Sequence, residues 1–217
     1  MAIVAVLAAM LGPNISNMME GSRSARCSGN LKQLGVAFNS YCTDHDGKVP
    51  FVEKYGGYYG SAEVFSLLLP YASNRQTYQC PSDHRRIPNV PVDDPNIMTN
   101  RVSYGANDLI TGNYAKAPRT GGVNRLAQIQ QSPSKVVLFF DTDLIHTRFM
   151  TIGEALGVSA FDPNNTIPSK TRHRGGANFL FADGHTAWLQ TSKYPEKAGV
   201  NYPDATNVEA TFSPLLK

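Results

Sequence analysis

The first 42 residues predict a single long helix with two unlike halves. Residues 2–11 are uncharged and apolar on every side, Gly12-Pro13 interrupts them, and a polar stretch runs from residue 14 to residue 30. Apolar residues then recur at the spacing of one helix face, at Cys27, Leu31, Leu34, Phe38 and Tyr41. We expect a helix from near residue 3 to about residue 43 whose second half packs on the rest of the fold.

The apolar half of this helix is short. Ten residues at ~1.5 Å each make roughly 15 Å, about half of a ~30 Å hydrocarbon core. The segment also lacks the charged start and small-residue cleavage site of a secretory signal peptide. Two interpretations remain open: part of a longer membrane or bundle helix, or an ordinary buried core helix.

Two later segments predict an antiparallel sheet. Residues 136–140 are too short for a helix and rich in β-branched and aromatic residues, which favours a central strand. In residues 178–189, Asp183-Gly184 predicts a two-residue hairpin turn, which would place Phe179 opposite Trp188 and leave both faces apolar. Residues 74–82 predict a short strand. The expected fold class is therefore α+β, with the long helix packed on this sheet.

Composition narrows the classes of protein. A chain of 217 residues with 41% hydrophobic content is long enough for one ordinary domain with an extension, or at most two domains. The net charge is only +3 and there is no run of Lys or Arg, so nucleic acid is not an expected partner.

Three cysteines stand at positions 27, 42 and 80, without a CxxC pair, so a zinc site of thiolates is not expected. Cys27 and Cys42 lie on the same predicted helix, roughly 22 Å apart by helical rise, and cannot bridge each other. Cys80 can pair with either of them, or all three are buried free thiols.

The candidates for chemistry are His173 and Asp183, either as general base and acid or as ligands of a cation such as calcium together with Asp141 and Asp143. Structural roles explain them as well. Asp183 suits the hairpin turn, and His173 precedes a strand that would separate the two side chains by more than ~15 Å. We therefore predict no catalytic residues, and expect His173 to anchor its loop on Asp141 or Asp143.

Several segments together resemble the prepilin-type His-x9-Asp-Gly family of pilin-like proteins. They are, in order, IVAVLAAMLGP with Pro13, SRSARCSGNLKQLGVAF, YCTDHDGKVP, YQCPSD, and the motif residues His173, Asp183 and Gly184. The resemblance implies a pilin-like α+β fold, with residues 1–26 as a projecting membrane or filament-core segment and residues 27–217 as a globular domain with a loop-rich C-terminal region. It also implies a disulfide between Cys27 and Cys80, which both fall in family-like segments.

The same resemblance implies a non-enzymatic subunit, similar to the pseudopilins of type II secretion. Such a subunit is anchored in the inner membrane, carries its globular domain in the periplasm or outside the cell, and assembles with other pilin-like subunits through the helix. The side chains expected to make that assembly or membrane contact are Ile3, Val4, Val6, Leu7, Met10, Leu11 and Pro13. No cofactor is expected, calcium being the one ion considered.

The family's basic leader, Gly-Phe cleavage site and early Glu do not precede Ile3, and we expect that the start is trimmed. Two other functions remain open. One is a membrane-tethered binding protein, for example for polysaccharide, which an exposed aromatic strip at Tyr55, Tyr58 and Tyr59 would favour. The other is a metal-dependent hydrolase, which would need at least three ligands converging in a concave pocket.

Overall fold

The computed structural model describes residues 2–50, 60–72, 74–83, 102–111, 123–142 and 172–190, and for residues 2–14, 60–63 and 108–109 the backbone alone. The helices and strands are α1 (Ala2–Asp44), α2 (Gly60–Leu68), β1 (Tyr104–Ala106), α4 (Asp108–Thr111), β2 (Val137–Asp141), β3 (Gly176–Phe181) and β4 (Thr186–Gln190). Short 3-10 turns are η1 (Leu69–Tyr71), η2 (Arg75–Tyr78) and η4 (Leu126–Gln128). The predicted α+β class is confirmed.

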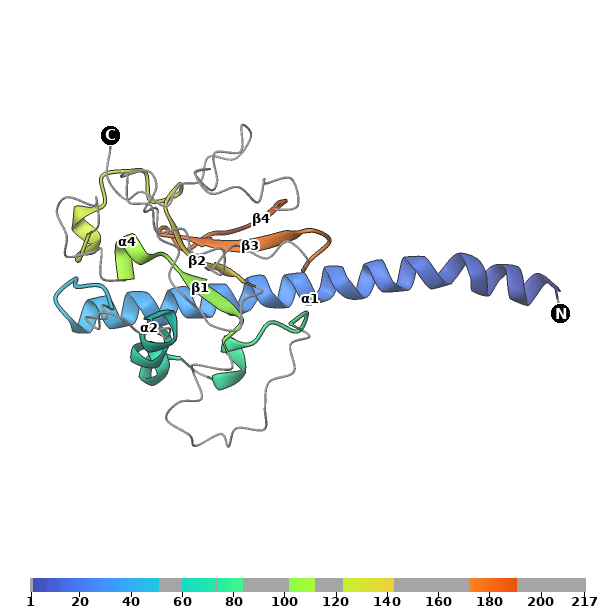
Figure 1. Cartoon of the computed structure of the whole chain (residues 1–217), viewed down its shortest axis with the longest axis horizontal. Coiled ribbons are helices and arrows are strands. Elements are labelled where there is room, and N and C mark those ends of the chain that lie inside the picture. Colours follow the sequence, from blue (N-terminus) through green and yellow to red (C-terminus); the bar gives the residue numbers. More distant parts are fainter. Residues whose placement is uncertain are drawn as a thin grey trace.

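The N-terminal helix α1 is continuous through Pro13 and spans 43 residues, as the sequence predicts. It ends in left-handed backbone at Asp46 (φ 55°) and Gly47 (φ 77°), where the amide of Gly47 donates to the carbonyl of Cys42 at 2.7 Å. Figure 1 shows the C-terminal half of α1 lying beside the sheet and α2, while the N-terminal half extends away from them.

The predicted apolar stripe of α1 is buried. Cys27, Leu31, Leu34 and Phe38 are fully buried and belong to one hydrophobic cluster, against which Tyr41 packs. The ring of Phe38 meets Phe139 of β2 edge-on at 5.7 Å between centroids. These contacts confirm that the second half of α1 covers the sheet.

The four strands form an antiparallel sheet in the order β1-β2-β3-β4. Every residue of β2 and β3 is buried, which confirms residues 136–140 as the core of a central strand apart from a one-residue shift. The strand predicted at residues 74–82 is wrong. Its first half forms η2, because the side chain of Asn74 accepts from the amide of Gln76 and caps a helical turn.

The hairpin between β3 and β4 forms, but its predicted register is wrong by one residue. Phe179 lies opposite Ala187, and Trp188 lies opposite Asn178. The loop has three residues instead of two, and Gly184 (φ 88°) takes a left-handed conformation whereas Asp183 does not. Trp188 consequently lies on the face toward α1 and stays 45% exposed, instead of sharing a buried face with Phe179.

Some predictions fall outside the part of the chain that the structure describes. These are the side chains of residues 3–13, the tyrosines at 55, 58 and 59, Asp143 and the C-terminal region beyond residue 190. Contacts between α1 and the rest of the fold extend back to Asn17, whose carbonyl accepts from Arg174. The packed part of the helix therefore begins before residue 27.

Candidate functional site

The motif histidine occupies the junction of α1, β2 and the loop before β3. Its side chain is fully buried, with Nδ1 2.8 Å from Oε1 of Glu20 and Nε2 3.2 Å from Oδ2 of Asp141. Nε2 also lies 3.3 Å from the sulfur of Cys80. The predicted pairing of His173 with Asp141 is confirmed, so this residue ties three distant parts of the chain together.

The backbone around His173 has an uncommon conformation. His173 (φ 48°), Arg174 (φ 65°) and Gly175 (φ 80°) are consecutive left-handed residues, and the amides of Gly175 and Gly176 both donate to the carbonyl of Arg172. Left-handed backbone costs about 1–2 kcal/mol for a residue with a side chain. The contacts of the two side chains, and the indole of Trp188 donating to the carbonyl of His173 at 2.9 Å, offset that cost.

Asp141 ends β2 and is completely buried. Its Oδ2 accepts from the backbone amide of Asn178 at 2.8 Å and from the side-chain amide of Asn178 at 2.9 Å, in addition to facing His173. Its Oδ1 has no hydrogen-bond partner among the described residues. Oδ2 therefore joins the end of β2 to β3, whereas Oδ1 is a buried acceptor that no described residue uses.

A buried ion pair lies next to His173 in sequence. Arg172 contacts Oδ2 of Asp83 at 2.8 Å, and both side chains are 3% exposed. Arg172 also donates to the carbonyl of Ser103 at 2.9 Å, and the hydroxyl of Ser103 donates to Asp83 at 2.7 Å. The hydroxyl of Ser82 donates to Glu20 at 2.7 Å, so the YQCPSD segment meets both α1 and the His173 loop.

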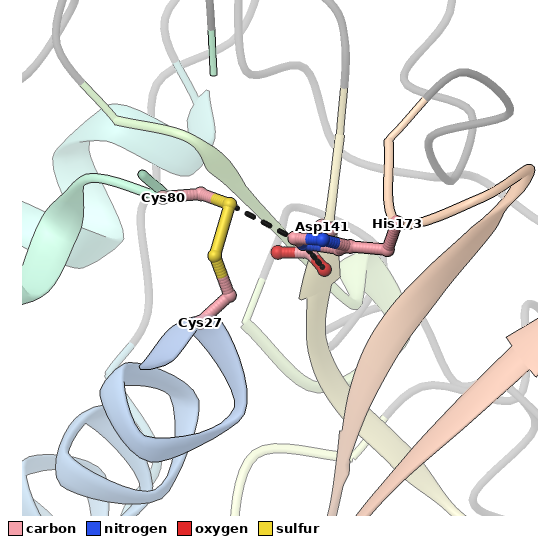
Figure 2. A group of neighbouring side chains, drawn as sticks. All are labelled: Cys27, Cys80, Asp141 and His173. Carbon is pink, nitrogen blue, oxygen red and sulfur yellow. Dashed lines mark hydrogen bonds and ion pairs between the residues drawn. A yellow bond between two sulfur atoms is a disulfide. The ribbon is translucent and has the colours of Figure 1, made fainter. Parts of the chain in front are cut away.

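Cys27 and Cys80 form a disulfide with a Cα–Cα separation of 5.1 Å, and Cys42 is a free, buried thiol. The predicted pairing is confirmed. Figure 2 shows the disulfide on one side of the cluster, with Asp141 and His173 facing it from the sheet side. The cross-link joins α1 to the segment that carries Asp83.

The acidic residue of the motif has a different role from the histidine. Asp183 lies in the hairpin loop, and its Oδ1 accepts from the backbone amide of His185 at 3.0 Å and contacts the His185 ring nitrogen at 2.5 Å. The partners described for His173 do not include it. Asp183 and Gly184 form the turn, as predicted, although with a longer loop.

Glu20 is the site residue that the sequence interpretation missed. It is the sole acidic residue between positions 1 and 43, which is a signal that an unusual contact is required there. Burial raises the pKa of Glu20, but hydrogen bonds from Ser82 and His173 lower it by more than burial raises it. The pKa of Glu20 therefore lies below the ordinary 4.5. Burial lowers the pKa of His173, but the carboxylates of Asp141 and Glu20 raise it above 6.5.

Comparisons with protein-family models, with curated proteins and with solved structures gave no match. The function therefore rests on the chemistry of the described residues. The arrangement around His173 can hold a positive charge between two carboxylates and can fix the orientation of α1 on the sheet.

The pKa shifts predict a pH window for the stability of this contact. Because the folded pKa of His173 is raised, its contribution is complete below pH 6.5 and lost as the pH rises through the folded value. Because the folded pKa of Glu20 is lowered, its contribution is complete above pH 4.5 and lost as the pH falls through the folded value.

We therefore expect the contribution of this pair to the melting temperature of the protein to be largest between pH 4.5 and 6.5. Melting scans between about pH 3 and pH 9 on the native protein and on Glu20→Gln test this, since glutamine keeps the shape and loses the charge. The difference between the two proteins should be largest inside the window. A difference that does not vary with pH would contradict the assignment.

Proposed function

We propose that the chain is a non-enzymatic, pilin-like subunit, anchored in the inner membrane, that assembles through its N-terminal helix in a secretion or surface-filament apparatus. The observation that carries this proposal is the division of α1, one half of which packs on an antiparallel sheet while the other extends beyond it (Figure 1). The sequence resemblance supplies the pilin-like class.

Exposed apolar side chains where the projecting half of α1 begins support assembly. Ile15, Met18 and Met19 are 52%, 74% and 52% exposed, and they continue the uncharged stretch of residues 2–11. Contiguous exposed apolar surface is typical of sites that contact another protein or a membrane. Among the described helices, none combines the length and the hydropathy needed to cross a bilayer.

The contacts at the base of the projecting half support a role in which this helix has a fixed orientation. The disulfide at Cys27, the Glu20–His173 contact and the bond from Arg174 to the carbonyl of Asn17 hold α1 at three positions over about three turns. A subunit that assembles through a helix needs that helix in a fixed direction relative to its globular part. The motif histidine then serves orientation instead of catalysis.

Replacing Met18 by Glu tests the proposal. Met18 is exposed, so the variant should keep the stability of the fold. In a helix–helix contact between subunits, losing the buried methionine side chain removes about 1.5–3 kcal/mol of apolar burial. Association should therefore weaken by roughly 10- to 100-fold. The measurement is sedimentation of the full chain in detergent as a function of protein concentration. Val36→Glu is the matched control, because Val36 is 66% exposed on the packed half of α1.

Association that weakens in Met18→Glu and not in Val36→Glu would support assembly through the projecting half. Equal association of both variants and the native chain would contradict it. Equal melting temperatures of the three proteins are required for either conclusion, so that a loss of folding is not counted as a loss of assembly.

A membrane-tethered binding protein is the second candidate, because a hollow of about 260 Å³ lies beside the half-exposed Trp188. It is lined by Glu20, Gly21, Ser24, His173, Arg174 and Trp188. Trp188 is the one tryptophan of the chain, so its fluorescence reports directly on this hollow. A saturable change on addition of soluble polysaccharide, absent in Ser24→Phe, which would fill the hollow without adding a second tryptophan, would favour this candidate.

A further inference from the structure

Four side chains with metal-binding atoms converge beside the motif histidine. Cys27 comes from α1, Cys80 from the segment after η2, Asp141 from the end of β2 and His173 from the loop before β3. All four are buried, and one ligand atom from each lies within 4.8 Å of the others (Figure 2). No short sequence motif contains these four donors, because each belongs to a different segment of the chain.

Two details of the cluster point to a ligand. Oδ1 of Asp141 is buried without a hydrogen-bond partner among the described residues, and such an orphaned carboxylate oxygen is costly unless something binds it. His173 presents Nε2 to the sulfurs while Nδ1 faces the carboxylate of Glu20 at 2.8 Å. Metal-binding histidines are usually oriented by a carboxylate that contacts the ring nitrogen not bound to the metal, here Nδ1.

We propose that, when Cys27 and Cys80 are reduced, their thiolates bind one zinc ion together with Nε2 of His173 and the carboxylate of Asp141. Two sulfurs, one imidazole nitrogen and one carboxylate oxygen suit tetrahedral Zn²⁺. Calcium prefers six to eight oxygen ligands, which this set does not offer. The disulfide and the zinc ion are then alternative cross-links between the same two segments.

The two states are connected by a balanced exchange. A dithiol reductant passes two electrons and two protons to the Cys27–Cys80 bond, which breaks into two thiols, while the reductant closes its own disulfide. Zn²⁺ then displaces both thiol protons, which pass to solvent. A newly made chain that has not been oxidised starts directly from the two thiols.

Cobalt binding to the reduced full-length chain tests the proposal. The protein is unfolded, reduced with a phosphine, and refolded without oxygen in the presence of one equivalent of Co²⁺, which reports coordination through its visible spectrum. We expect tetrahedral bands with a thiolate charge-transfer band, bleached by one equivalent of Zn²⁺. The oxidised protein should show neither.

Variants assign the ligands. Cys42→Ser is the matched control, because Cys42 is buried outside the cluster and burial raises the pKa of its thiol to about 12. It should leave the spectrum unchanged, while Cys80→Ser should roughly halve the thiolate band, since the Cys27 thiolate remains, and Asp141→Asn should weaken cobalt binding. Glu20→Gln should lower zinc affinity by about 10- to 100-fold, as expected for a partner that orients a ligand.

Circular dichroism keeps the test decisive if the reduced chain does not fold alone. Zinc should then restore the helical signal, and zinc without recovery would overturn the proposal. An octahedral cobalt spectrum, or binding that survives replacement of both Cys27 and Cys80, would also overturn it. None of these outcomes depends on assembly through the helix, so failure of one proposal leaves the other intact.

Discussion

Replacing both Cys27 and Cys80 by alanine is expected to lower the free energy of unfolding by about 4 kcal/mol. The disulfide closes a loop with a sequence separation of 53 residues, and the chain-entropy treatment assigns that amount to the lost freedom of the unfolded chain. The loss should appear as a drop of more than about 1 M in the midpoint of urea unfolding.

The control for this experiment is Cys42→Ala, which removes a buried sulfur without opening a cross-link. Its effect should be about 1 kcal/mol, the typical cost of a point substitution. All samples contain a chelator, so that a metal held by reduced cysteines does not replace the disulfide. Equal unfolding midpoints for the double variant and the control would show that the cross-link does not stabilise the fold.

Asp83→Ala is expected to destabilise the protein by about 3–5 kcal/mol, because it leaves the guanidinium of Arg172 buried and uncompensated. The same substitution removes the acceptor for Ser103. The effect should therefore exceed that of a partly exposed ion pair such as Glu20–Arg23, since pairs near the surface are typically worth less than about 1 kcal/mol.

The double variant Asp83→Leu with Arg172→Met separates the charge from the packing. It removes both charges and keeps apolar volume, so it should be less destabilising than Asp83→Ala alone. Urea unfolding of the native chain and both variants measures this. A double variant less stable than the single one would mean that the hydrogen bonds to Ser103 matter more than the uncompensated charge.

The parts of the fold that the sequence predicts are those determined by local patterns. The period of Cys27, Leu31, Leu34 and Phe38 specifies which face of α1 is buried, and all four are fully buried. The uninterrupted apolar run at residues 136–140 suits a strand covered on both faces, and every residue of β2 is buried. β2 is also a central strand, because it lies between β1 and β3.

The hairpin register shows where a local pattern is insufficient. Asp183-Gly184 fits either a two-residue loop or the second part of a three-residue loop, and the choice moves each cross-strand partner by one position. The contacts of β3 with α1 are consistent with the longer loop. Asn178 reaches Ser24, and Leu180 lies 3.1 Å from the position that a Cβ on Gly35 would take.

The site itself depends on contacts that no local pattern contains. Glu20 and His173 are 153 residues apart in sequence, and Cys80 and His173 are 93 apart. A helix face, a turn and a strand end can each be expected from their own residues, but their meeting point requires the packed fold. Asp141 was predicted as a partner because it follows the strand expected at residues 136–140, whereas Glu20 lies in a stretch of α1 that was expected to project freely.

The position of the Cys27–Cys80 cross-link has a mechanical consequence. At ~1.5 Å per residue, α1 is about 64 Å long, and the cross-link holds it at Cys27, within the part of the helix that packs on the fold. Tension applied along the helix from its free end can peel it from the sheet as far as Cys27, where a covalent bond stops the separation. The 53-residue loop behind that bond is shielded from the pull, so a stretched chain is shorter by about 180 Å than one without the bond.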